Sequence, residues 1–202
     1  MNPGLLIVVS GPAGVGKGSV IRRAMELTDN LSTSVSATSR KPRPGEIDGV
    51  HYFFKTREQF EAMIKEERLV EWVEYCGNYY GTPKEYVTRE LEKGKNIILE
   101  IEVEGSMKIK EMFKDSILCF IVPPSYEELA RRLRNRNTED EETIRRRLNR
   151  ALEEFQYIDR YDYVVLNDSI EEAAQRFLSI IRAEEMRTFR NKALIDQLKV
   201  RE

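Results

Sequence analysis

Continuous apolar runs, separated by amphipathic stretches, are the dominant pattern along this chain. The clearest runs cover residues 5–9, 97–99, 117–122 and 163–166. They are unbroken rather than alternating, as expected for strands of a parallel sheet that is buried on both faces. A fifth candidate strand at residues 34–38 is more polar and gives a weaker signal. The pattern predicts an α/β fold with helices on both faces of a parallel sheet.

Capping signals place helices between these runs. Thr82-Pro83-Lys84-Glu85 combines a capping box with proline at the first helical position, and Gly94 stands where that helix should end. Further capping boxes begin at Ser125 and Ser169, each just after a predicted strand. In the last helix, the residues expected to pack on the sheet are Ile170, Ala173, Phe177, Ile181 and Glu184.

The alternation of strands and helices is interrupted at residues 40–82, which are rich in tyrosine and phenylalanine. Short alternating stretches at 51–54 and 69–75 predict a small mixed α/β insert there. The core is then expected to consist of residues 4–39, 83–124 and 151–184. The chain becomes more polar beyond residue 184, and residues 185–202 are predicted to form a helical extension.

Composition narrows the class of protein. Of 202 residues, 41% are hydrophobic and 34% charged, which is typical of a soluble globular domain. The longest apolar runs are about six residues, far below the roughly 20 that a membrane helix needs, and no signal peptide is evident. The net charge of −2 suggests neither nucleic acid nor membrane as a partner. Two cysteines, Cys76 and Cys119, form no disulfide framework or metal-ligand pattern, so we expect a cytoplasmic protein.

A glycine-rich segment follows the first strand: Gly11-Pro12-Ala13-Gly14-Val15-Gly16-Lys17-Gly18-Ser19. Its glycines allow successive backbone N–H groups to turn inward around phosphate oxygens, and the following helix adds its positive N-terminus. Lys17 would reach the β- and γ-phosphates of ATP. Strand, loop, lysine and helix occur in the order of a P-loop. The segment therefore predicts ATP binding, although it does not identify the acceptor.

The loop departs from the commonest P-loop pattern, because Gly18 separates Lys17 from Ser19. Mg²⁺ is expected as the cofactor that accompanies ATP. The ion could be held by the Ser19 hydroxyl, or mainly by ATP oxygens and water. Glu100, at the end of a predicted strand, is a candidate outer-sphere partner.

Nearly the whole chain, residues 4–184, resembles the guanylate kinase family. The resemblance rests on the run from Ser34 to Tyr52, on Leu69-Val70-Glu71-Trp72, on Gly77-Asn78-Tyr79-Tyr80-Gly81-Thr82 and on Leu99 to Gly105. It implies a P-loop NTPase-type fold and transfer of the γ-phosphoryl group of ATP to GMP, with dGMP as a further acceptor, in purine metabolism and GMP recycling. It also implies that Arg40, Arg43, Tyr52 and Tyr80 hold the GMP phosphate, and that Ser36, Glu71, Thr82 and Glu102 contact guanine.

The physical chemistry of these side chains agrees with the resemblance. Arginine and phenolic donors suit a dianionic phosphate. A carboxylate such as Glu71 can accept from guanine N1–H and the 2-amino group, whereas adenine would leave it unpaired. Two positions differ from the commonest family form, which often has Asp at Glu102 and Gln at Glu104.

Residues 125–150 resemble the family's helical lid, in which Arg132, Arg136 and Arg147 face the phosphates. Asn167, in Val165-Leu166-Asn167-Asp168, is expected on the ATP side. No general base is needed, because the GMP phosphate oxygen is already anionic, and the lid and insert are expected to close over the substrates.

Three other functions are less consistent with the sequence. A guanylate-kinase-like scaffold module typically has a degraded P-loop, whereas Lys17 and the loop glycines are intact here. A kinase for another acceptor, such as adenylate, thymidylate or a ribose bisphosphate, is less consistent with Glu71 and the Arg40/Arg43 pair. A motor or switch ATPase would need a coupling domain. The pattern does not decide between a monomer and a homo-oligomer.

Overall fold

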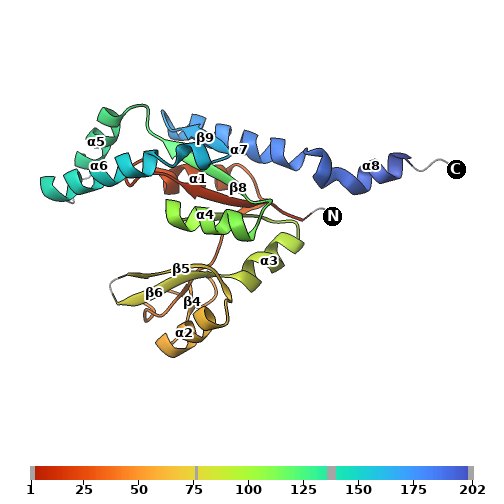
Figure 1. The fold of residues 1–202 in the computed structure, drawn as a ribbon, viewed down its shortest axis with the longest axis horizontal. Coiled ribbons are helices and arrows are strands. Elements are labelled where there is room, and N and C mark those ends of the chain that lie inside the picture. The colour runs from red at the N-terminus through yellow and green to blue at the C-terminus, as the bar shows by residue number, and fades with distance from the viewer. Residues whose placement is uncertain (1–2, 76, 136–139, 200–202) are drawn as a thin grey trace.

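Two sheets organise the computed structural model, which describes residues 3–75, 77–135 and 140–199 (Figure 1). The larger sheet is parallel throughout, with strand order β2-β7-β1-β8-β9. Its strands are β1 (Leu6–Ser10), β2 (Leu31–Thr33), β7 (Asn96–Glu100), β8 (Ile117–Val122) and β9 (Tyr163–Leu166). The predicted parallel sheet is confirmed.

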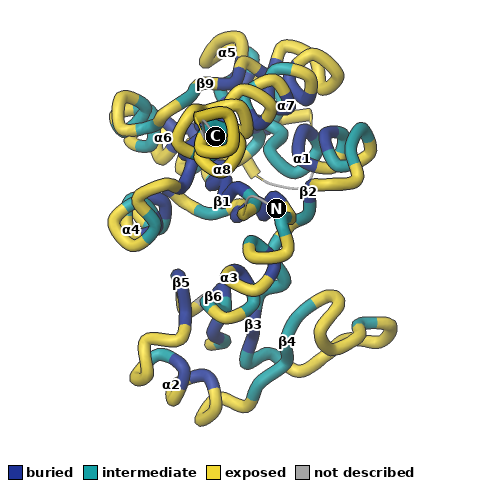
Figure 2. The backbone as a smooth tube through the Cα atoms, turned by 90° about the vertical axis from the view of Figure 1, so that its right-hand side faces the viewer, coloured by how far each residue is buried: buried dark blue, intermediate teal, exposed yellow. Residues whose placement is uncertain are grey.

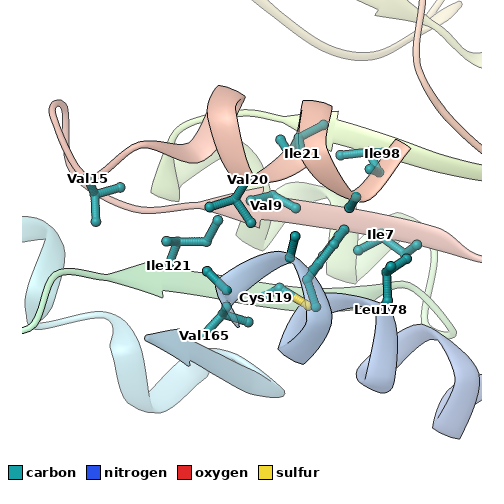
Figure 3. Close-up of a cluster of buried hydrophobic side chains, with 14 of the residues drawn as sticks. Ile7, Val9, Val15, Val20, Ile21, Ile98, Cys119, Ile121, Val165 and Leu178 are labelled. Atoms are coloured by element: carbon teal, nitrogen blue, oxygen red, sulfur yellow. The ribbon is translucent and has the colours of Figure 1, made fainter. Parts of the chain in front are cut away.

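Helices cover both faces of this sheet, because neighbouring strand residues point to opposite sides. Ile7 and Val9 of β1 belong to the core shared with α1 (Lys17–Glu26), α5 (Tyr126–Arg134), α6 (Glu141–Phe155) and α7 (Ile170–Glu185). Figure 3 shows this core, with Ile21 of α1 and Leu178 of α7 directed at the strands. Leu6 and Val8 pack on the other side with α3 (Lys84–Glu92) and α4 (Val103–Met112).

The smaller sheet is mixed, with strand order β4-β3-β6-β5. Its strands are β3 (Ala37–Thr38), β4 (Phe53–Phe54), β5 (Leu69–Tyr75) and β6 (Asn78–Pro83). β3 and β4 run parallel, whereas β6 is antiparallel to both β3 and β5. Helix α2 (Arg57–Lys65) buries Phe60 and Met63 against this sheet. In Figure 1 the sheet and α2 form a separate layer below α4.

The fifth predicted strand, residues 34–38, was placed wrongly. The fifth strand of the parallel sheet is β2, which ends at Thr33. The Ser34 amide still bonds to the carbonyl oxygen of Ile98, and the chain then crosses to the smaller sheet, where β3 pairs with β6. The smaller sheet therefore begins before residue 40, and β2 is short because the chain leaves the parallel sheet after Thr33.

The helix caps are partly as predicted. Ser125 and Ser169 are the N-caps of α5 and α7. The prediction for Thr82 is wrong, since Thr82 belongs to β6 and Pro83 is the N-cap of α3. The prediction that Ile170 faces the sheet is also wrong, because its side chain is 48% exposed, whereas the other four residues assigned to that face are buried.

The predicted boundary between lid and core, at residues 150 and 151, falls within α6. Leu129, Leu133, Ile144 and Leu148 of α5 and α6 are buried in the main core, so both helices pack on the body of the protein. A 3₁₀ turn, η1 (Ile158–Arg160), then leads to β9.

Beyond α7 the chain continues through a 3₁₀ turn, η2 (Thr188–Asn191), and α8 (Lys192–Lys199). Figure 2 shows α8 almost wholly exposed, in contrast to the buried strands. Among the residues that the structure describes, no helix combines the length and apolarity needed to cross a membrane.

Candidate active site

The glycine-rich loop connects the end of β1 to the start of α1. Gly11, Gly14 and Gly16 have φ values of 143°, 88° and 96°, a region that side chains other than glycine rarely adopt. A Cβ atom on Gly16 would lie 2.6 Å from Nδ2 of Asn167. Gly16 is also the N-cap of α1 and makes no side-chain capping bond. The N–H groups at this helix start are therefore suited to binding an anion.

Lys17 lies across this loop, with its Nζ donating to the Gly11 carbonyl oxygen at 2.5 Å. The carboxylate of Glu100 faces the same region, since its Oε2 lies 3.7 Å from where a Cβ on Gly18 would stand. This proximity follows from the sheet, because Glu100 of β7 pairs with Val9 of β1. A cation and a carboxylate thus stand at the carboxyl edge of the sheet, near Ser19 in the first turn of α1.

Two predicted residues from distant parts of the chain bind the back of the loop. Asn167 is 3% exposed, and its Nδ2 donates to the Val15 carbonyl oxygen at 2.7 Å. The Nη1 of Arg132 donates to the same oxygen at 3.4 Å, and its Nη2 donates to the Asn167 carbonyl at 3.0 Å. The structure therefore brings Arg132, predicted to face the phosphates, together with Asn167 and the loop, both predicted to lie on the ATP side.

Glu128 is a residue of this region that the sequence analysis missed. It accepts from Nε of Arg132 at 2.8 Å, and hydrogen bonds from Arg131 and then Arg132 lower the pKa of Glu128 to about 2. Its spacing of four residues from Arg132 on one helix was a usable signal. Of the other predicted arginines, Arg147 is half-buried on α6, and Arg136 lies outside the described residues.

A cavity of about 1010 Å³ opens between the mixed sheet and the β7–α4 segment. Residues predicted to bind GMP line it: Ser36, Tyr52, Glu71, Tyr80, Thr82 and Glu102. They come from segments up to 66 residues apart in sequence, and Glu100 and Glu104 also contribute to the lining. The fold thus gathers most of the predicted acceptor residues on one surface.

Glu71 and Thr82 face each other across β5 and β6, where they are register partners. The Thr82 hydroxyl donates to Oε1 of Glu71 at 2.7 Å, and Thr82 is 1% exposed. Burial raises the pKa of Glu71, and the hydrogen bond from Thr82 partly opposes this rise. In this structure the single hydroxyl hydrogen of Thr82 is directed at Glu71, so Thr82 orients this carboxylate.

Arg40 stands beside this cavity, with its guanidinium 5.4 Å from the ring centre of Tyr52. It makes a two-fold ion pair with Glu46, with Nη1–Oε2 and Nη2–Oε1 distances of 2.9 and 2.8 Å. The Arg40 hydrogen bond, followed by one from the Arg43 amide, lowers the pKa of Glu46 to about 2. Tyr52 and Tyr80 are neighbours, with ring centres 6.1 Å apart. The side chain of Arg43 is exposed.

Glu46 is therefore a second residue that the sequence analysis missed, since it fixes the guanidinium of a predicted phosphate ligand. In the sequence, only the position of Glu46 just after Arg43-Pro44-Gly45 indicated that it could pair with a nearby arginine. Among the described residues, no group of three or more histidine, cysteine, aspartate or glutamate side chains has metal-binding geometry.

Comparison with known proteins agrees with this geometry. The family model for guanylate kinase matches residues 4–184. A guanylate kinase from Halalkalibacterium halodurans is 55% identical over 181 residues, which are 90% of this chain and 89% of that one. One from Caldanaerobacter subterraneus is 48% identical over 98% of this chain and 96% of that one. The solved guanylate kinase from Anaplasma phagocytophilum gives a TM-score of 0.73 at 33% identity, covering 100% of this chain and 98% of that one. With its loop, cavity and sequence all in agreement, this chain belongs to the guanylate kinase family.

Proposed function

We propose that this kinase transfers the γ-phosphoryl group of ATP to GMP, giving ADP and GDP, and that it also accepts dGMP. The observation that carries the proposal is the presence of two groups of anion-binding residues together with one partly buried carboxylate, that of Glu71. The glycine loop with Lys17 stands on the parallel sheet, whereas Arg40 and Tyr52 stand at the cavity that Glu71 lines. The enzyme would serve GMP recycling in the cytoplasm, where both nucleotides are made and used.

Glu71 supplies the specificity for guanine. Held by Thr82 and largely removed from water, its ionised carboxylate accepts from N1–H and the 2-amino group of the base. Adenine would place an acceptor opposite this carboxylate and would leave it buried without donors, which can separate substrates by roughly 10⁴-fold. Ser36 and Glu102, which line the same cavity, complete the contacts to the base.

The GMP phosphate is held by Arg40, Arg43, Tyr52 and Tyr80. Glu46 takes one edge of the Arg40 guanidinium and so fixes the direction of its remaining N–H donors. The two phenolic hydroxyls add neutral donors from Tyr52, just before β4, and from Tyr80 in β6. This arrangement holds the acceptor oxygen in place, which is the main requirement for transfer between two phosphates.

On the ATP side, the loop from Gly11 to Ser19 binds the phosphates through its backbone N–H groups, and Lys17 stabilises the charge that spreads over the γ-phosphoryl group. Arg132, Arg136 and Arg147 add charge from the lid, which excludes water when it closes together with the insert. Asn167 supports the loop through the Val15 carbonyl. No proton acceptor is required, because the attacking GMP oxygen is anionic.

The residues at the edge of the sheet fit a magnesium ion. Carboxylate and hydroxyl oxygens are hard ligands, and Mg²⁺ is commonly held by one or two carboxylates together with substrate phosphates. Glu100, whose carboxylate faces the start of α1, and Ser19 would hold the ion there. When bound, it would neutralise part of the phosphate charge during transfer.

An acceptor screen with Mg-ATP tests the proposal. Purified protein is supplied with GMP, dGMP, AMP, CMP, UMP and dTMP, and ADP formation is followed in a coupled assay. We expect GMP to be the best acceptor, dGMP to be weaker, and AMP to be lower by about 10³-fold or more in kcat/KM. If the protein binds ATP but phosphorylates none of the monophosphates, a scaffold module is favoured. If a monophosphate with another base is the best acceptor, GMP is not the substrate.

A further inference from the structure

Arg150, on α6, is surrounded by carboxylates from two parts of the fold. Its Nη2 lies 2.6 Å from Oε1 of Glu104 and 3.9 Å from Oε2 of Glu102. Its other nitrogens approach Glu153 at 3.2 Å and Glu154 at 3.5 Å on its own helix. Because Glu102 is the N-cap of α4 and Glu104 lies in its first turn, Arg150 links α6 to the start of α4.

The position of Arg150 on α6 is also informative. Arg147, Arg150 and Glu154 follow one another at spacings of three and four residues, so they lie along one side of the helix. The neighbouring stripe, with Leu148 and Ala151, is buried in the main core and fixes the rotation of α6. Burial raises the pKa of Glu154, and the positive charges of Lys17 and Arg150 oppose this rise. Arg150 therefore lies on the same side of α6 as Arg147, the arginine of this helix that is predicted to face the phosphates.

The residues that Arg150 contacts on α4 belong to the acceptor cavity. Glu102 and Glu104 both line it, and their side chains are 82% and 55% exposed. A nucleoside monophosphate is a dianion near neutral pH, so carboxylates on the wall of its site repel it. The hydrogen bond from Arg150 lowers the pKa of Glu104, which therefore stays ionised. Arg150 is a cation at hydrogen-bond distance from this carboxylate, and it offsets the charge of Glu104.

We propose that Arg150 is a positioning residue for phosphoryl transfer, acting through its ion pair with Glu104. The pair ties α6, which carries Arg147, to the start of α4, which carries Glu102. It also removes the repulsion that Glu104 would exert on an incoming GMP dianion. One side chain thus connects the helix that serves ATP with the wall that receives GMP.

Arg150 acts through other residues rather than on substrate. Four carboxylate oxygens lie within 4.0 Å of its guanidinium, so its donors are engaged by the protein. The inference rests on the proposed function, because it assigns GMP to the cavity and the ATP phosphates to the side of Arg147. The double-mutant cycle distinguishes a failure of this inference from a failure of the proposed function.

The cycle uses Arg150→Met, Glu104→Ala and the double variant, with kcat and KM measured for GMP and ATP. Arg150→Met should raise KM for GMP about 5-fold, the scale of a half-exposed ion pair, and lower kcat about 3-fold. Glu104→Ala should lower kcat by a similar factor without raising KM for GMP. In the double variant, KM for GMP should return to the Glu104→Ala value and kcat should fall no further, since both changes break the same link.

Two further measurements separate positioning from a general loss of structure. Raising the salt concentration should reduce the KM defect of Arg150→Met, because a half-exposed charge is screened. Arg150→Lys should restore part of the loss in KM. Arg146→Met is the matched control, since Arg146 bonds to Thr143 on an exposed part of α6 and should stay within about 2-fold of the wild type in both constants.

The outcomes are distinct. If the wild type does not phosphorylate GMP, both the proposed function and this inference are overturned. If it does, but the effects of Arg150→Met and Glu104→Ala multiply, Arg150 does not act through Glu104 and only the inference fails. Should Arg150→Met fold poorly in a thermal unfolding assay, Glu104→Ala alone still decides, because unchanged kcat there contradicts the link.

Discussion

The two substrate sites of this kinase are built in different ways. The ATP side is a continuous segment whose shape depends on backbone conformation, with three glycines at positive φ between β1 and α1. The acceptor side is a cavity whose chemistry comes from side chains on five separate segments, from Ser36 to Glu102. A site of the first kind is encoded locally, whereas a site of the second kind exists only once distant segments have paired.

The two sides also differ in how they are held together. β1 is buried at every position between two layers of helices. The mixed sheet has a small apolar cluster, Ala37, Phe60, Met63, Leu69 and Tyr79, and depends in addition on polar contacts such as Arg40–Glu46 and Thr82–Glu71. Since regions with fewer buried apolar contacts open at lower free energy, the acceptor side should be the more adaptable half of the site.

Removing Lys17 tests the ATP side and should give the largest effect. Lys17→Ala should lower kcat by about 10²- to 10³-fold or more, because the ammonium that stabilises the transferring phosphoryl group is lost. Binding of GMP, measured by calorimetry, should change little, because Lys17 does not line the acceptor cavity. Circular dichroism and thermal unfolding control for folding, and a near-normal rate in this variant would rule out the mechanism.

Changing Glu71 tests the acceptor side with a smaller effect. Glu71→Gln keeps the size of the side chain but replaces one acceptor with an amide donor that faces the donors of guanine. We expect KM for GMP to rise about 10-fold or more, with KM for ATP within about 2-fold of the wild type. Equal losses for both nucleotides would show that the two sides are not independent, which would break the comparison.

The same variant gives a pH test. Burial raises the pKa of Glu71 above its ordinary value of 4.5, so the carboxyl takes up a proton at a higher pH than an exposed glutamate does. Once protonated, it is a weaker acceptor for guanine, and kcat/KM for GMP should therefore fall as the pH is lowered. The GMP phosphate titrates in the wild type and in Glu71→Gln alike. The part of the acid limb that is absent from Glu71→Gln belongs to Glu71, and identical profiles would contradict the assignment.

Thr82 offers the smallest and most specific change. Thr82→Val keeps the shape of the side chain but removes the hydroxyl that orients Glu71. KM for GMP should rise about 3-fold, and the free energy of unfolding should fall by about 1 kcal/mol, as for one buried hydrogen bond. When Thr82→Val is introduced into the Glu71→Gln variant, the further rise in KM for GMP and the further loss of stability should both be smaller, because the charged acceptor is already gone. Additive effects would mean that Thr82 does not act through Glu71.

Several features could be predicted from the sequence because their physical cause is local. Ser125 and Ser169 are helix N-caps as expected, since capping depends on neighbouring residues. The capping box assigned to Thr82 failed because the same residue had a tertiary partner, Glu71, that no local pattern reveals. The strand at residues 34–38 failed for a similar reason, because the chain leaves one sheet for the other there.

By itself, the sequence determined the parallel sheet and the phosphate loop, because runs of apolar residues and glycine spacing act through the backbone over short distances. The acceptor residues came from resemblance to a family, not from any pattern within the chain. Only the tertiary structure decided that Glu46 holds Arg40, that Glu128 holds Arg132 and that Arg150 joins α6 to α4. These are contacts between charged side chains, whose partners are set by how helices and strands pack and not by composition or periodicity.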